Sequence, residues 1–100
     1  NPKNNHLVLT ITTLFRYFLN LLTYHYQKKT TPNTQEMARL LGVHPFFMKD
    51  YIDGGKIYNA MKCATTISLL REYDMKSKGV GNANISDGEL LKELIFKIMH

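Results

Sequence analysis

The sequence predicts an all-α protein, and three observations support this class. Apolar residues recur at spacings of three and four along most of the 100-residue chain. Only 3 Pro and 6 Gly are present, which is few for a protein built of many short strands and turns. The hydrophobic share of 44% with 21% charged residues is typical of a globular domain and excludes disordered and collagen-like chains. We therefore expect one domain over residues 1–100, a bundle of about five helices.

The first predicted helix begins near Pro2 or His6 and ends near Gln27. Its polar residues form one narrow stripe: Thr13, Arg16, Asn20, Thr23 and Gln27. The rest of its circumference is apolar, so we expect this helix to pack on more than one side. A strand over Leu7–Ile11, where β-branched residues cluster, is the alternative. Because most of the circumference of this helix is apolar, we predict a subunit interface at Leu7, Ile11, Phe15, Phe18 and Leu22.

A sequence pattern typical of a helix-turn-helix follows the polar loop 28–33. The second helix has Asn33 or Thr34 as its N-cap and ends at Gly42, the residue type that most often follows a helix C-terminus. The third helix starts at His44-Pro45 and is expected to stop at Gly54-Gly55.

Within this pair, Ala38 precedes Gly42 by four residues and Met48 follows it by six. We expect Ala38 and Gly42 to lie at a close helix crossing, with Phe46 or Phe47 beneath it.

Two longer helices complete the predicted fold. The fourth runs from about Lys56 to Lys78, and a loop rich in glycine and asparagine follows it over Gly79–Ile85. Ser86 and Glu89 then form a capping box, the signature of a helix start. The last helix places its apolar residues on one face: Leu90, Leu91, Leu94, Ile95, Ile98 and Met99.

The net charge of +5 is concentrated in the first third of the chain. Residues 1–33 carry four bases and no acid, whereas residues 34–100 carry nine bases and eight acids. This bias suits weak attraction to phosphate or to an acidic partner, and it falls short of the clustered stripe of a dedicated nucleic-acid reader. Arg16 lies in the middle of the apolar segment 7–26, so we expect no membrane span there.

No pattern of reactive side chains indicates an enzyme. The possible metal ligands lack the spacing of known zinc motifs: His6, His25, His44, His100 and Cys63. Cys63 lies in mid-helix as the single cysteine, so a disulfide framework is excluded and a cytoplasmic location is expected. We therefore predict no catalytic, cofactor-binding or metal-binding residue.

Four stretches carry a family resemblance by their order and spacing: Leu14–Phe18, Met37–Tyr51, Leu69–Gly79 and Leu90–Ile95. Together they resemble the C-terminal domain of the bacterial DNA polymerase III delta subunit over most of residues 7–99. The opening Asn1-Pro2-Lys3, without an initiator Met, likewise suggests the C-terminal part of a longer chain whose AAA+-like N-terminal part is not included.

The resemblance implies a non-ATPase component of the clamp loader, which places the sliding clamp on primed DNA during replication. Such a domain would join the ATPase subunits and delta prime in a helical collar, while the N-terminal region would engage the clamp. Primer-template DNA would be a partner of the assembly. Five basic residues would then add to a positive field along the DNA path: Arg16, Lys28, Lys29, Lys76 and Lys78.

A fragment of a DNA-binding regulator is the alternative, because the segment around Gly42 has a helix-turn-helix rhythm. Its second helix would offer Phe46, Phe47 and Asp50 to the bases, which is a poor set for base readout.

Overall fold

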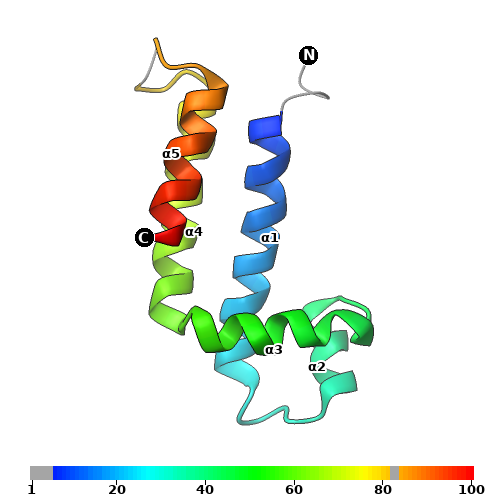
Figure 1. The fold of residues 1–100 in the computed structure, drawn as a ribbon. Helices are drawn as coiled ribbons and strands as arrows, with labels where there is room; N and C mark the ends of the chain where they lie inside the picture. Colours follow the sequence, from blue (N-terminus) through cyan, green and yellow to red (C-terminus); the bar gives the residue numbers. More distant parts are fainter. Residues whose placement is uncertain (1–5, 82–83) are drawn as a thin grey trace. The chain divides into compact units, whose positions relative to one another are not determined.

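The computed structural model describes residues 6–81 and 84–100, is 80% helical, and contains no strand within those ranges. Its elements are α1 (His6–Gln27), α2 (Thr34–Leu41), a 3₁₀ turn η2 (Pro45–Phe47), α3 (Met48–Ile57), α4 (Ala60–Ser77) and α5 (Asp87–Met99) (Figure 1). The predicted all-α class with about five helices is confirmed. The alternative strand at Leu7–Ile11 is wrong, since this segment forms the first turns of α1; Pro2 lies outside the described residues.

The chain divides into two compact units. Unit 1 contains the described residues up to Arg16 together with those from Thr66 onward, and unit 2 contains Tyr17–Thr65. Helices α1 and α4 therefore each contribute residues to both units.

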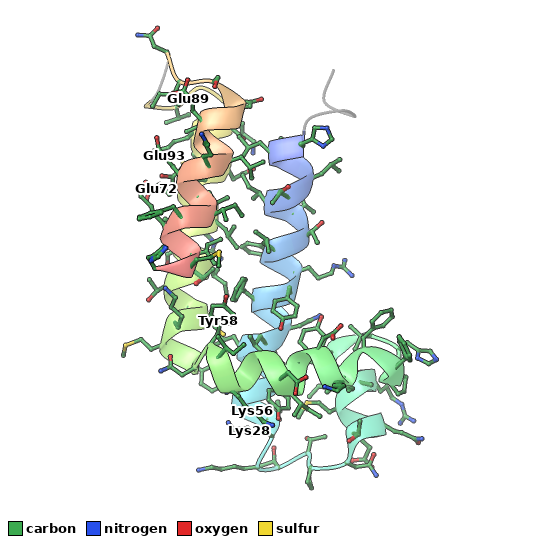
Figure 2. The ribbon with its side chains drawn as sticks, viewed as in Figure 1. Lys28, Lys56, Tyr58, Glu72, Glu89 and Glu93 are labelled. Atoms are coloured by element: carbon green, nitrogen blue, oxygen red, sulfur yellow. The ribbon has the colours of Figure 1, made fainter. Side chains whose placement is uncertain are left out.

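Unit 1 is built mostly on aliphatic side chains at helical spacing, together with the buried Thr66 and Tyr73 of α4. Its buried residues come from α1 (Leu7, Ile11), α4 (Thr66, Ile67, Leu70, Tyr73) and α5 (Leu90, Leu94, Ile98). The hydroxyl of Tyr73 donates a hydrogen bond to Glu93 Oε1 at 2.8 Å and so joins α4 to α5. Helix α5 runs in front of α4 in Figure 1, and Glu93 is labelled in Figure 2. The ammonium groups of Lys76 and Lys97 lie over the same tyrosine ring, 4.6 and 5.1 Å from its centroid.

In unit 2, aromatic rings and one close backbone approach join α1 to α3, beside buried aliphatic and methionine side chains such as Leu21 and Met48. Tyr17 of α1 stacks on Tyr51 of α3 with 5.0 Å between ring centroids, and its hydroxyl donates to the carbonyl oxygen of Asp50 at 3.0 Å. Phe18 is buried and meets the edge of Tyr58 at 5.1 Å. A Cβ built on buried Gly54 would collide with the Tyr17 hydroxyl, so only glycine lets α3 approach α1 this closely.

This close approach explains where two predicted helix boundaries were wrong. Gly54-Gly55 do not stop the third helix, which continues to Ile57 because Gly54 serves packing within the helix. The fourth helix consequently begins at Ala60 instead of Lys56. Tyr58 is extended between the two helices, and the Asn59 side-chain oxygen accepts a hydrogen bond from the Lys62 amide at 2.8 Å.

The predicted helix caps are confirmed. Asn33 Oδ1 accepts from the Glu36 amide at 3.1 Å, and Ser86 Oγ accepts from the Glu89 amide at 3.2 Å. Gly42 ends α2 with a φ of 72°, a left-handed conformation that glycine adopts without a steric penalty.

The expected close crossing at Ala38 and Gly42 is wrong in part. Ala38 is buried, but a Cβ on Gly42 would have no atom within 4 Å, so this glycine is required by its backbone conformation and not by packing. Phe46 and Phe47 are exposed instead of lying beneath the pair. The buried positions belong to Met37, Leu41 and Met48. The 3₁₀ turn over Pro45–Phe47 displaces the two rings from the helical positions that the sequence pattern assumed.

Candidate binding surfaces

The structure places three of the five predicted interface residues inside the chain's own core. Leu7, Ile11 and Phe18 are buried, so they offer no surface to another subunit. Phe15 and Leu22 are half-buried. The exposed large apolar residues of α1 are instead Leu9, Leu19 and Tyr26. When apolar residues surround most of a helix, the sequence does not reveal which side the chain itself buries. For this reason Leu7, Ile11 and Phe18 were assigned to an interface although they lie in the core.

The first apolar surface lies in unit 2 and consists of Phe46 and Phe47 of the 3₁₀ turn, and Leu40 of α2 is also exposed. Phe46 is 78% exposed, and Phe47 and Leu40 are each about half exposed. The two phenyl rings pack edge to face with 5.4 Å between their centroids. His44 Nδ1 accepts a hydrogen bond from the Phe46 amide at 2.9 Å and so fixes the start of this turn. Sequence reasoning expected these phenylalanines in the core.

A second apolar surface lies on α5 in unit 1 and consists of Ile95, Phe96 and Met99. All three are exposed, and the Phe96 ring stacks on His100 with 4.4 Å between centroids. They occupy the side of α5 opposite its buried residues Leu90 and Leu94. The predicted apolar face of this helix therefore has an inner part and an outer part.

The described part of unit 1 also contains a groove between α1 and α4 with a volume of about 500 Å³. We call it the α1–α4 groove, and its lining residues are Ile11, Thr12, Phe15, Leu70, Arg71, Asp74 and Met75. Ile11 and Leu70 are buried and close its floor, while Met75 is 53% exposed. Sequence reasoning missed this groove, because helical periodicity does not say which helices lie together.

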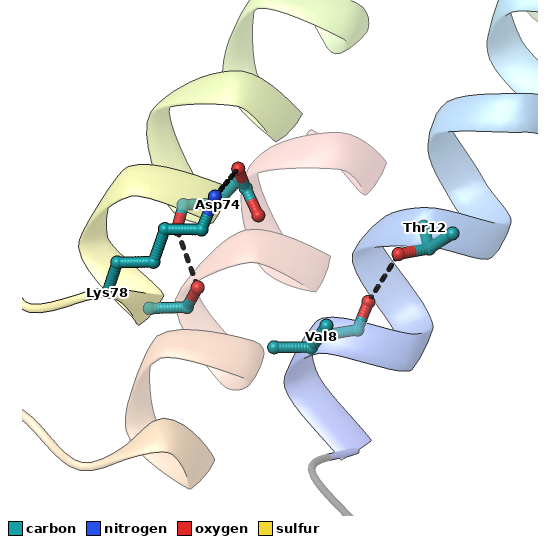
Figure 3. A network of polar contacts seen from close by, with 5 residues as sticks. Val8, Thr12, Asp74 and Lys78 are labelled. Carbon is teal, nitrogen blue, oxygen red and sulfur yellow. Dashed lines mark hydrogen bonds and ion pairs between the residues drawn. The ribbon is translucent and has the colours of Figure 1, made fainter. Parts of the chain in front are cut away.

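The polar side chains of the groove differ in whether they have a hydrogen-bonding or ion-pair partner within the chain. Asp74 accepts a hydrogen bond from the Lys78 ammonium at 3.0 Å, and the Thr12 hydroxyl donates to the Val8 carbonyl at 2.9 Å (Figure 3). The Arg71 guanidinium lies 5.8 Å from the Phe15 ring centroid and forms no ion pair with a described residue. Arg71 is thus the uncompensated charge of the groove lining.

The five predicted DNA-facing basic residues do not form one patch within either unit. Arg16, Lys76 and Lys78 belong to unit 1, whereas Lys28 and Lys29 belong to unit 2. Lys76 pairs with Glu72 at 3.1 Å and Lys78 pairs with Asp74.

Lys28 and Lys29 of unit 2 are both exposed. The Lys28 ammonium also lies 3.3 Å from His25 Nδ1 and 5.9 Å from the centroid of the Tyr24 ring. A role for any of the five in contacting DNA remains a prediction.

Two of the residues considered for metal binding or nucleophilic chemistry, His25 and Cys63, form hydrogen bonds to the same backbone carbonyl oxygen. His25 Nε2 donates to the Tyr58 carbonyl at 2.7 Å, and Cys63 Sγ donates to the same oxygen at 3.7 Å. Burial raises the pKa of the Cys63 thiol, which keeps it in its unreactive form. Within residues 6–81 and 84–100, no three His, Cys, Asp or Glu side chains are grouped as metal ligands would be.

Comparison with known protein families, with curated proteins and with solved structures found no match. Among the described helices, α1 is long and apolar enough to cross a membrane. Core helices of water-soluble proteins share this property, so length and composition do not decide its environment.

Proposed function

We propose that this chain is a protein-interaction module, the collar domain of a DNA polymerase III delta subunit in a bacterial clamp loader. The observation that carries the proposal is the pairing of an all-helical fold with exposed apolar surfaces in both units: Phe46 and Phe47 in unit 2, and Ile95, Phe96 and Met99 in unit 1. Exposed aromatic side chains are enriched at protein interfaces and often dominate their binding energy.

The sequence resemblance supplies the identity of the proposed assembly. Its partners would be the ATPase subunits and delta prime, with the sliding clamp and primer-template DNA engaged by the whole complex in the cytoplasm. In this role the domain itself carries no catalytic step. The interface is proposed at the two exposed apolar surfaces, in place of the buried residues Leu7, Ile11 and Phe18.

Reconstitution tests this proposal directly. The chain is mixed with the ATPase and delta prime subunits of a bacterial clamp loader, and the complex is followed by size-exclusion chromatography with light scattering. We expect a stoichiometric complex that Phe46→Ser or Phe96→Ser weakens at least tenfold. Lys29→Ser, an exposed substitution outside both apolar surfaces, is the matched control and leaves assembly unchanged. Absence of a complex, or equal assembly by all three variants, would contradict the proposal.

A DNA-binding regulator is the second candidate because α2 is followed by a turn at Gly42 and then by η2 and α3, the order of elements that a helix-turn-helix has. The side chains that this arrangement exposes argue against base readout. Phe46 and Phe47 are apolar, and Lys49 is paired with Asp53 at 2.6 Å. A sequence-selective complex with duplex DNA would favour this candidate over the collar module.

A further inference from the structure

We propose that the α1–α4 groove binds an acidic amphipathic helix of a partner protein, with apolar side chains in the groove and a carboxylate on Arg71. This proposal rests on the proposed function only in that the chain is a protein-interaction module. The clamp loader is not needed for the proposal to hold.

The shape and lining of the groove suit apolar side chains of a helix. Its volume of about 500 Å³ falls in the range of about 300–1,000 Å³ found for ligand sites. Phe15 and Met75 line it from opposite helices above the closed floor of Ile11 and Leu70. A helix laid in such a groove would anchor residues at positions i, i+3 or i+4, and i+7.

The charges around the groove select an acidic occupant. Helix α1 contains no Asp or Glu, so its wall carries no negative charge. The single carboxylate of the lining, Asp74, is already compensated by Lys78. Arg71 lies in the lining without an ion partner among the described residues, and its planar group can bind a carboxylate through two parallel hydrogen bonds.

Arg16 extends this positive field along α1. It follows Thr12 by four residues, so it lies one turn further on the same helix face. Arg16 is exposed and also forms no ion pair with a described residue. Two uncompensated arginines therefore accompany an apolar groove, which matches a partner that alternates apolar and acidic side chains.

The same observations favour a protein over a nucleic acid. Nucleic-acid binding draws its strength from many phosphate contacts, whereas one uncompensated cation, Arg71, lines this groove and a second, Arg16, lies one turn beyond it. The apolar residues Phe15 and Met75 line the groove from α1 and α4. They do not form a row of aromatic rings on which successive bases could stack.

A display library of helical 18-residue peptides, randomised over apolar, acidic, basic and neutral polar residues, tests the proposal on the 100-residue chain. We expect the selected peptides to combine three spaced apolar residues with at least one Glu or Asp. The affinity of these peptides, measured by fluorescence anisotropy, should fall at least tenfold with Arg71→Glu. It should stay within twofold with Arg39→Glu, an exposed control arginine in unit 2.

Charge exchange makes the test specific for the Arg71 contact. A selected peptide whose acidic residue is replaced by Lys should lose binding to the native chain and regain at least part of it with Arg71→Glu. Met75→Asp, a change at an exposed groove residue, should weaken every selected peptide. Circular dichroism spectra of all variants confirm that each remains folded.

Several results would overturn the proposal. One is selection of peptides without acidic enrichment, and another is an equal loss of affinity with Arg71→Glu and Arg39→Glu. Displacement of the peptides by random single-stranded oligonucleotides would identify the groove as a nucleic-acid site. Concentration-dependent dimerisation that Met75→Asp abolishes would identify a second copy of the chain as its occupant. The collar assembly described above can fail without affecting any of these outcomes.

Discussion

Unit 1 and unit 2 bury similar kinds of helix by different means. Unit 1 uses leucines and isoleucines at spacings of three and four, and its core residues Leu70, Leu90 and Leu94 are at most 1% exposed. Unit 2 also buries apolar residues such as Leu21 and Met48, but it joins α1 to α3 through tyrosine rings around a glycine, with Gly54 directly against Tyr17. The first kind of packing is visible in a sequence, because each helix displays its own apolar stripe. The second depends on a contact between residues 37 positions apart and is invisible until the helices are placed.

Among the changes that compare the two units, we expect Leu94→Ala in unit 1 to lower the free energy of unfolding most. This side chain is fully buried, so its truncation removes transfer free energy and leaves a cavity. We expect the free energy of unfolding to fall by about 2–5 kcal/mol. Leu9→Ala, the same change at a leucine that is 53% exposed in the same unit, should cost below about 0.5 kcal/mol. Urea denaturation measures both, and equal losses would contradict the assignment of the core.

In unit 2 the corresponding change is Gly54→Ala, which adds atoms instead of removing them. The new Cβ would collide with the Tyr17 hydroxyl and lie 3.2 Å from Cζ of the same ring. We expect a loss of about 1–3 kcal/mol in the free energy of unfolding, as for other overpacked contacts.

A double-mutant cycle identifies the cause of this loss. Tyr17→Phe removes the colliding hydroxyl, so Gly54→Ala should cost less in that background than in the native chain. Gly88→Ala is the control, since its Cβ would have only Ser86 Oγ nearby, at 4.0 Å, and it should be neutral or stabilising. An additive cycle would show that Tyr17 is not the obstacle.

The tyrosine packing of unit 2 should also make stability depend on alkaline pH. Burial raises the pKa of the Tyr17 phenol above its ordinary value of 10.0, and the neighbouring Tyr51 and Asp50 act in the same direction. The unfolded chain therefore loses this proton at lower pH than the folded chain. The contribution of Tyr17 is complete below pH 10.0 and declines as the pH rises through its raised pKa. Thermal unfolding between neutral and alkaline pH should show a smaller decline for Tyr17→Phe than for the native chain.

The smallest expected effect concerns DNA, and it compares the basic residues of the two units. Because Lys76 and Lys78 are already paired with carboxylates and the net charge of the chain is +5, the isolated chain should bind duplex and single-stranded oligonucleotides weakly and without sequence preference. We expect dissociation constants at or above about 10⁻⁴ M at physiological salt, the weak end of non-specific binding. Lys29→Ser in unit 2 and Arg16→Ser in unit 1 should each change the salt dependence only slightly. A nanomolar, sequence-selective complex in a salt titration would contradict the collar proposal.

The sequence by itself determined the local structure of this protein. Its periodicity and its capping residues Asn33, Gly42 and Ser86 place most helix ends correctly, because a cap involves only neighbours along the chain. The charge count also placed the excess of bases in residues 1–33, which contain four bases and no acid, and this count required no knowledge of packing.

The tertiary structure alone decided which apolar residues are inside. It buried Leu7, Ile11 and Phe18, exposed Phe46 and Phe47, and joined residues of α1 and α4 into a groove. A helix face becomes buried only when another helix packs against it, whereas a sequence pattern describes the face of one helix at a time. Gly54 illustrates the same limit, since a glycine reads as a helix end until a tyrosine from another helix is found against it.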